Sequence, residues 1–228
     1  MASEIKQGTL ELVNHLPILQ VITPMLIAPI LVVLNNKTLS WLLSFLGALA
    51  CLFISILLIQ AVSDGSILTY YLGGWVPPIG IEYRIDAANS ILLFLISIIS
   101  AIVLIFSYSS LHAEIPEEKH TLFYSCFLLC LTGLLGVVAT ADIFNVFVFL
   151  EISSLSTYVL VAQGAYLDRR ALSSSFNYLI MGTIGATFFV IGIGYIYMAT
   201  GSLNMMDIAE RVNQLSDNRT IQAGFAFI

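Results

Sequence analysis

Six long apolar segments, each almost free of charged residues, constrain what this chain can fold into more than any other feature. They cover residues 15–34, 38–62, 86–109, 121–141, 142–163 and 171–200. A helix needs about 20 mostly apolar residues to cross the roughly 30 Å hydrocarbon core of a bilayer, and each segment meets that requirement. We therefore expect an all-α polytopic membrane protein that is surrounded by the lipid bilayer.

The composition supports this class of fold and argues against others. Charged residues make up 10% of the chain and hydrophobic residues 59%, whereas a soluble domain carries about 25% charged residues. The net charge of −6 argues against nucleic acid as a partner. The sequence holds no Walker, Rossmann or zinc signature and no catalytic triad, so we expect no bound cofactor.

The three cysteines all lie in apolar segments. Cys126 and Cys130 share a helix face at i, i+4, where they could bind a metal, and His120 lies less than two turns before Cys126. Because no further soft ligand is nearby, we interpret both residues, together with Cys51, as packing residues. We therefore predict no metal site and no disulfide.

Two elements are expected outside the spans. Residues 64–85 form a long loop whose Gly and Pro residues disfavour a helix, and its parts 67–71 and 79–85 are predicted to pair as a short hairpin. Residues 204–215 repeat apolar side chains at helical spacing with charges on the other side. This pattern predicts an amphipathic helix at the membrane interface, with Asn204 as its N-cap.

The chain divides into three parts by this pattern. Residues 1–14 form an N-terminal extramembrane segment, residues 15–109 hold three membrane helices with the hairpin loop, and residues 120–228 form a second helical unit. Residues 221–228 begin another apolar segment that stops after about two turns, too short to cross a bilayer. We therefore expect the chain to be the N-terminal part of a longer protein.

Glu151 lies near the middle of the apolar segment 142–163, in which no cation accompanies it. A carboxylate at the centre of a bilayer costs about 3 kcal/mol or more, so a helix retains one where it faces a partner, a water-filled cavity or an ion path. We interpret Glu151 as a residue that handles protons or cations. The alternative is a structural role, as a hydrogen-bonding strut or a static partner of a basic residue.

Three polar residues near Glu151 are candidates for its support. Helical spacing places Ser154 and Tyr158 on the face of Glu151, and Asn145 lies six residues before it. Hydroxyl groups on that face could hydrogen-bond the carboxylate or hold a short file of waters. Such groups equally often satisfy helix carbonyls or mediate packing, so both interpretations stay open for Ser154 and Tyr158.

Other polar residues and the glycines are given structural roles. Asp86 and Asp142 each lie at the start of a span, where we predict an N-cap in preference to ion handling. Solvated positions are expected for Glu82, Arg84, Glu114, Glu117 and Glu118. His112 and His120 flank the acidic turn and could feed protons, but a solvated loop position is the favoured interpretation for both. Gly182, Gly185, Gly192 and Gly194 line the sixth segment. Among them, Gly182-x-x-Gly185 puts small residues on one side and is predicted to let a neighbouring helix approach closely.

Several segments, taken together in their order and spacing, resemble one family of membrane proteins. They are Tyr71-Leu72-Gly73-Gly74-Trp75 with Pro77-Pro78-x-Gly80-Ile81, Ala141-Asp142-Ile143-Phe144-Asn145 with Phe149-Leu150-Glu151-Ile152-Ser153-Ser154, and Tyr197 with Thr200-Gly201-Ser202-Leu203-Asn204-Met205. This set resembles the D subunit of the multisubunit Mrp-type cation/proton antiporters. The same superfamily includes the antiporter-like subunits of respiratory complex I and of membrane-bound hydrogenases.

The resemblance implies a fold and a role for Glu151. The family's bundle contains two inverted-topology repeats, each with a broken helix, so residues 120–228 would hold an incomplete proton-translocating repeat. Glu151 would be the fifth-helix glutamate of the first half-channel, paired with a lysine on the seventh helix. No lysine follows Lys119 in this chain, so that lysine is expected beyond Ile228.

Three functions remain open at this point. The leading hypothesis is a proton-translocating subunit of a Na⁺/H⁺ antiporter, a transporter more than an enzyme, with Glu151 as proton relay. It would lie in a prokaryotic cell membrane with other integral membrane subunits, and handle protons and Na⁺. The alternatives are an antiporter-like subunit of a complex I-type NADH–quinone oxidoreductase or membrane-bound hydrogenase, and a non-conducting structural subunit or truncated fragment.

Overall fold

The computed structural model describes residues 2–215 and 218–228, with side chains from Val13 onward in those ranges. Six of its helices are long and apolar enough to cross a membrane, which confirms the predicted class of fold. They are α1 (Ala2–Leu34), α2 (Lys37–Val62), α3 (Ala87–Glu114), α4 (His120–Ala139), α5 (Ile143–Gln163) and α6 (Arg170–Thr200).

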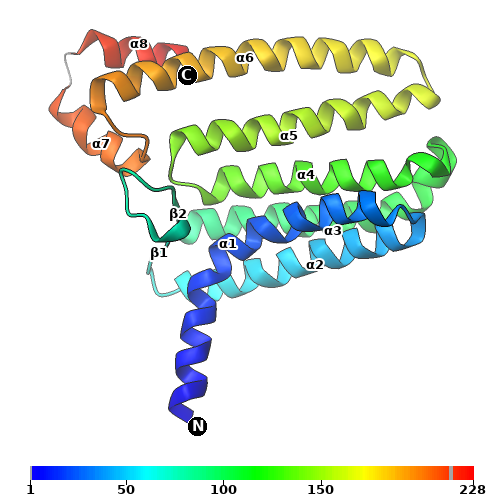
Figure 1. The fold of residues 1–228 in the computed structure, drawn as a ribbon, viewed down its shortest axis with the longest axis horizontal. Helices are drawn as coiled ribbons and strands as arrows, with labels where there is room; N and C mark the ends of the chain where they lie inside the picture. The colour runs from blue at the N-terminus through cyan, green and yellow to red at the C-terminus, as the bar shows by residue number, and fades with distance from the viewer. Residues whose placement is uncertain (1, 216–217) are drawn as a thin grey trace.

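The long helices form a bundle with a row of helices extending from it (Figure 1). α1, α2, α3 and α4 pack against one another, and α4 also packs on α5, which in turn packs on α6. The core of large buried side chains lies among the first four helices, and includes Leu31, Leu58, Leu93, Leu104 and Leu128. α6 is the most peripheral span, because only 17% of its apolar window is buried.

Local signals explain where α3 and α5 begin. Asp86 accepts a hydrogen bond from Asn89 N at 2.9 Å, and Asp142 accepts one from Asn145 N at 2.7 Å. Both predicted N-caps are therefore confirmed, since each satisfies a backbone donor that the first helical turn leaves free. The first helix begins at Ala2, earlier than the predicted span at residue 15, and its apolar window is Val13–Leu34.

The predicted hairpin is present at one end of the bundle. β1 (Leu68–Tyr71) and β2 (Glu82–Ile85) pair antiparallel, with Leu68 opposite Ile85. The short helix η1 (Leu72–Gly74) follows β1, and its Gly73 has a φ of 64°, a conformation that favours glycine. The hairpin contacts α1, and β2 also contacts α3 and α4.

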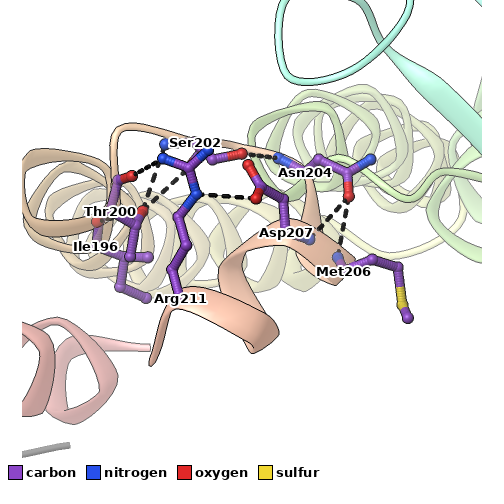
Figure 2. Close-up of polar contacts among 7 residues, drawn as sticks. All are labelled: Ile196, Thr200, Ser202, Asn204, Met206, Asp207 and Arg211. Atoms are coloured by element: carbon purple, nitrogen blue, oxygen red, sulfur yellow. Dashed lines mark hydrogen bonds and ion pairs between the residues drawn. The ribbon is translucent and has the colours of Figure 1, made fainter. Parts of the chain in front are cut away.

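Two short helices follow α6, namely α7 (Met205–Gln214) and α8 (Arg219–Phe227). Asn204 caps α7 by accepting hydrogen bonds from Met206 N at 3.0 Å and Asp207 N at 3.2 Å (Figure 2). The predicted helix and its cap are thus confirmed, and Ile208 on its apolar side is buried. α8 lies beside α6.

On its polar side, α7 is tied to the end of α6 by one arginine. Arg211 donates to Asp207 Oδ1 at 2.8 Å and to the Thr200 carbonyl at 2.6 Å (Figure 2). The bonds from Arg211 and then Ser202 hold the pKa of the Asp207 carboxyl below its usual range. The Thr200 carbonyl belongs to the last turn of α6, where helix carbonyls lack backbone partners, so Arg211 also completes that helix end.

Candidate functional site

Glu151 faces a cavity of about 270 Å³ between α5 and α6. The cavity is lined from α5 by Phe147, Leu150, Glu151 and Ser154, and from α6 by Met181, Gly182, Gly185, Ala186 and Phe189. Glu151 and Ser154 are both half-buried. The structure therefore brings Glu151 and Ser154 together at one opening, as their i, i+3 spacing on the helix predicted.

The cavity exists because α6 presents glycines opposite Glu151. A Cβ atom at Gly185 would meet no atom within 4 Å, and a Cβ atom at Gly182 would overlap the hydroxyl of Tyr158. The predicted close approach of a neighbouring helix is therefore confirmed at Gly182 and wrong for Gly185, which borders open space. Of the other two glycines, Gly194 has no neighbour within 4 Å, whereas a Cβ atom at Gly192 would lie 2.7 Å from the Gly224 carbonyl of α8.

Tyr158 connects α5 to α6 next to this cavity. Its side chain is buried, lies against Gly182, and packs edge-on against Tyr178 at a centroid distance of 5.0 Å. Ser175 on α6 donates a hydrogen bond to the Tyr158 carbonyl at 2.7 Å. Gly182 borders both the cavity and the Tyr158 hydroxyl, so Tyr158 belongs to the wall of the site although it does not line the opening itself.

The opposite face of α5 packs tightly on α4. Cys130 lies 3.6 Å from the Ser153 hydroxyl and 3.4 Å from the Thr157 hydroxyl. A Cβ atom at Gly133 would lie 2.6 Å from the Phe149 carbonyl, and one at Gly136 would overlap the Phe149 ring. The hydroxyl of Thr157 donates within α5, to the Ser153 carbonyl at 2.8 Å. This face is therefore a packing contact, and Cys130 takes part in it.

Asn145 lies outside the cavity of Glu151. Its side chain donates to Thr140 Oγ1 at 3.0 Å and also hydrogen-bonds Tyr83 of the hairpin. Burial raises the pKa of Tyr83 to about 12, so this phenol stays protonated near neutral pH. The structure thus places Asn145 in a junction between the start of α5 and the hairpin.

Sequence reasoning missed that junction, and the structure corrects the expectation that Glu82 points to water. Glu82 is 7% exposed, and its carboxylate accepts a hydrogen bond from Asn204 Nδ2 at 2.7 Å. Ala141 N donates to the Glu82 carbonyl at 2.8 Å. The loops before α5 and before α7 therefore both cover β2. From its alternation of charged and apolar residues, this strand is expected to face water on one side, but the two loops bury that side. Arg84, by contrast, is half-buried.

The expectation of a solvated loop is also wrong for His120. This side chain is 1% exposed, because it opens α4 where α2 and α3 pack on that helix. His112 is exposed, as are Glu114, Glu117 and Glu118, in agreement with their predicted solvated positions.

The electrostatic setting of Glu151 follows from what surrounds it. Among the described side chains, the ion pairs are Lys37–Glu117 and Asp207–Arg211, and neither reaches Glu151. Within the same residues, no group of three His, Cys, Asp or Glu side chains is arranged to hold a metal ion. The opening of about 270 Å³ beside Glu151 is large enough for several waters, so its carboxylate is accessible from within the span.

The six apolar spans of the described residues are those of a multi-pass membrane protein, with a glycine-lined cavity beside a mid-span glutamate. Residues 140–228 match the family described as NADH:quinone oxidoreductase/Mrp antiporter, transmembrane. This match covers the C-terminal part of the chain, and the resemblance drawn from its motifs is confirmed.

Three similar proteins extend the match toward the N-terminus. The N subunit of an NADH-quinone oxidoreductase from Desulforudis audaxviator is 38% identical over 217 residues, covering 94% of this chain and 42% of the relative. The D subunit of a Na⁺/H⁺ antiporter from Alkalihalophilus pseudofirmus is 30% identical over 203 residues, covering 89% of this chain and 40% of the relative. A chain of the archaeal membrane-bound sulfane sulfur reductase superposes with a TM-score of 0.82 at 31% identity, covering 95% of this chain and 43% of that one.

These comparisons agree on the architecture. The chain spans less than half the length of each protein that it matches here. Within that length it has the fold of an antiporter-like subunit, and its six apolar helices and bacterial relatives support a multi-pass protein of a prokaryotic cell membrane.

Proposed function

We propose that this chain forms part of a proton-translocating subunit of a multisubunit cation/proton antiporter, in which Glu151 takes up and releases the transported proton. The observation that carries the proposal is the position of Glu151, half-buried in a membrane span and open to a cavity of about 270 Å³. An ionisable side chain at this depth is retained where it serves an ion path. The similarity to the D subunit of a Na⁺/H⁺ antiporter supports Na⁺ as the exchanged cation.

The surrounding residues have distinct roles in this proposal. Ser154 lines the same cavity and offers a hydroxyl that can hydrogen-bond a water or the carboxylate. Tyr158 holds α5 against α6 and fixes the width of the opening through its contact with Gly182. The lysine that the family resemblance places on the seventh helix would then receive the proton in the full-length protein, which would work with other integral membrane subunits.

The test is Glu151→Gln in the full-length protein, assembled in its complex and measured in everted membrane vesicles. We expect Na⁺-induced proton movement, followed with a pH-sensitive dye, to be lost, because the amide cannot carry a proton at this position. Assembly, followed by co-purification of the other subunits, should be unchanged. Glu210→Gln on the exposed side of α7 is the matched control and should keep normal transport.

Full transport by the Glu151→Gln variant would contradict the proposal and favour a non-conducting structural subunit. Ser154→Ala and Tyr158→Phe should slow transport by smaller factors, since each removes one hydroxyl and leaves the carboxylate in place. A Ser154→Ala variant slower than Glu151→Gln would show that Glu151 does not have the main role.

A second candidate function is redox-driven pumping in a complex I-type enzyme. The higher identity to the N subunit of an NADH-quinone oxidoreductase, 38% against 30%, favours it. The same vesicles separate the two functions. Proton movement that follows quinone reduction and ignores added Na⁺ indicates the redox pump, and the reverse response indicates the antiporter.

A further inference from the structure

A cluster of titratable side chains lies at the end of the bundle opposite the hairpin, apart from the cavity of Glu151. His112 on α3 and His120 on α4 contact each other edge to face, with ring centroids 4.8 Å apart. Beside them, Lys37 at the start of α2 forms an ion pair with Glu117 of the turn η2 (Glu117–Lys119). A cavity of about 20 Å³, enough for one water, lies among Lys37, Thr38, Trp41, Tyr108, His112, His120 and Tyr124.

Backbone carbonyls fix which nitrogen of each imidazole carries a proton. His112 Nδ1 lies 2.9 Å from the Tyr108 carbonyl, and His120 Nε2 lies 3.0 Å from the Ile115 carbonyl. A carbonyl oxygen only accepts, so each of these nitrogens donates. The proton-accepting nitrogen is therefore Nε2 of His112 and Nδ1 of His120. His112 is exposed and His120 is 1% exposed, so a proton from water reaches His112 first.

The charges around His112 are of both signs. Glu117 is close enough to interact electrostatically with both imidazoles, and it already pairs with Lys37. The other titratable groups of this end are Tyr108 and Glu114 on α3, Glu118 and Lys119 in η2, and Tyr124 on α4. Glu114 accepts a hydrogen bond from Ser110 at 2.8 Å. Glu117 thus pairs with a lysine that lines the same small cavity as His112 and His120.

We propose that His112 is a proton-binding site that competes with Lys37 for Glu117. When water on this side of the membrane donates a proton to Nε2 of His112, the imidazolium attracts the Glu117 carboxylate and the ion pair with Lys37 weakens. When the proton leaves, Glu117 returns to Lys37. Because the Lys37–Glu117 pair joins the start of α2 to the turn before α4, the contact between these elements responds to pH.

The first test follows the protonation of His112 in the full-length protein within its complex. Diethyl pyrocarbonate modifies neutral imidazoles, and mass spectrometry of vesicles treated between pH 5 and 8 gives a midpoint for His112, with the exposed His15 as internal reference. Glu117→Gln should lower the midpoint and Lys37→Met should raise it, because each variant removes one charge near the imidazole. Glu114→Gln is the matched control and should leave it unchanged.

A second readout follows the ion pair itself. The acetylation of Lys37 relative to Lys119, which lies in the same turn as Glu117, should rise as the pH falls from 8 to 6, because the amine loses its carboxylate partner. In His112→Gln the ratio should stay constant. Equal His112 midpoints in the wild type, Glu117→Gln and Lys37→Met would overturn the proposal, and so would a constant Lys37 to Lys119 ratio in the wild type. Neither measurement depends on transport through Glu151.

Discussion

The two faces of α5 meet glycine pairs of the same spacing, and the outcomes differ. Toward α4, Gly133 and Gly136 are covered by the backbone and ring of Phe149 and by Ser153. Toward α6, the side-chain position of Gly182 contacts only the hydroxyl end of Tyr158, and that of Gly185 has no neighbour within 4 Å. The same spacing of small residues thus closes one contact and leaves a cavity beside Glu151 in the other.

This difference shows what a small-x-x-small pattern specifies. Glycines remove side chains and permit close approach, but the residue on the facing helix decides whether the space is filled. Phe149 fills the space toward α4 with a whole ring, whereas on the α6 side Glu151 and Ser154 face the opening with shorter side chains. A contact that holds the bundle and a site that holds water can therefore share one motif.

The largest expected loss of stability comes from adding a side chain to the closed contact between α4 and α5. In Gly136→Ala, the new methyl group would overlap the Phe149 ring, and overpacking of a closed contact costs about 3 kcal/mol at the upper end of its usual range. We expect a marked fall in the thermal stability of the detergent-solubilised complex. Gly194→Ala, whose new methyl group meets no atom within 4 Å, is the matched control, and equal stability of the two variants would contradict the comparison.

A smaller effect is expected at Gly182. Its new methyl group in Gly182→Ala would overlap the Tyr158 hydroxyl, which must then move at a cost of about 1.5 kcal/mol. Because only the hydroxyl overlaps strongly, the double variant Gly182→Ala with Tyr158→Phe should recover most of the lost stability. Thermal denaturation of both single variants and the double variant measures this coupling, and strict additivity would show that the two residues do not meet.

Gly185 should behave in the opposite way. Gly185→Ala adds a methyl group where no atom lies within 4 Å, and replacing a mid-helix glycine gains about 0.5 kcal/mol of helix stability. We expect unchanged or slightly raised thermal stability. Gly185→Leu fills the cavity in front of Glu151 and should lower the transport rate of the assembled complex while the protein remains folded. A stably folded Gly185→Leu variant with normal transport would show that transport does not need the cavity.

The spans and caps were predictable because their signals are local. Hydropathy marks the six helices, and an Asp or Asn next to the first turn marks the starts of α3, α5 and α7. The depth of Glu151 in its span, and its shared face with Ser154, also follow from counting residues along one helix. These features depend on neighbours within a few positions in the chain.

What could not be predicted depends on residues far apart in sequence. Gly133-x-x-Gly136 and Gly182-x-x-Gly185 look alike until the side chains of α5 are placed against them. Glu82 is buried because loops about 60 and 120 residues later cover its strand, as its bond to Asn204 shows. His120 is buried because α2 and α3 pack on α4 at its first residue. Such burial is a property of the assembled bundle.

The smallest expected effect on stability concerns a third contact, between α6 and α7. This contact is held by a charged side chain, Arg211, and not by glycine packing. Arg211 lowers the pKa of Asp207 in the folded protein, so this carboxylate adds stability above its unfolded pKa and loses it as the pH falls through the folded value. Wild-type thermal stability should therefore fall on strong acidification slightly more than that of Asp207→Asn, whereas Gly136→Ala should keep its deficit at every pH. An equal acid response in wild type and Asp207→Asn would mean that the ion pair adds nothing measurable, as many exposed pairs do.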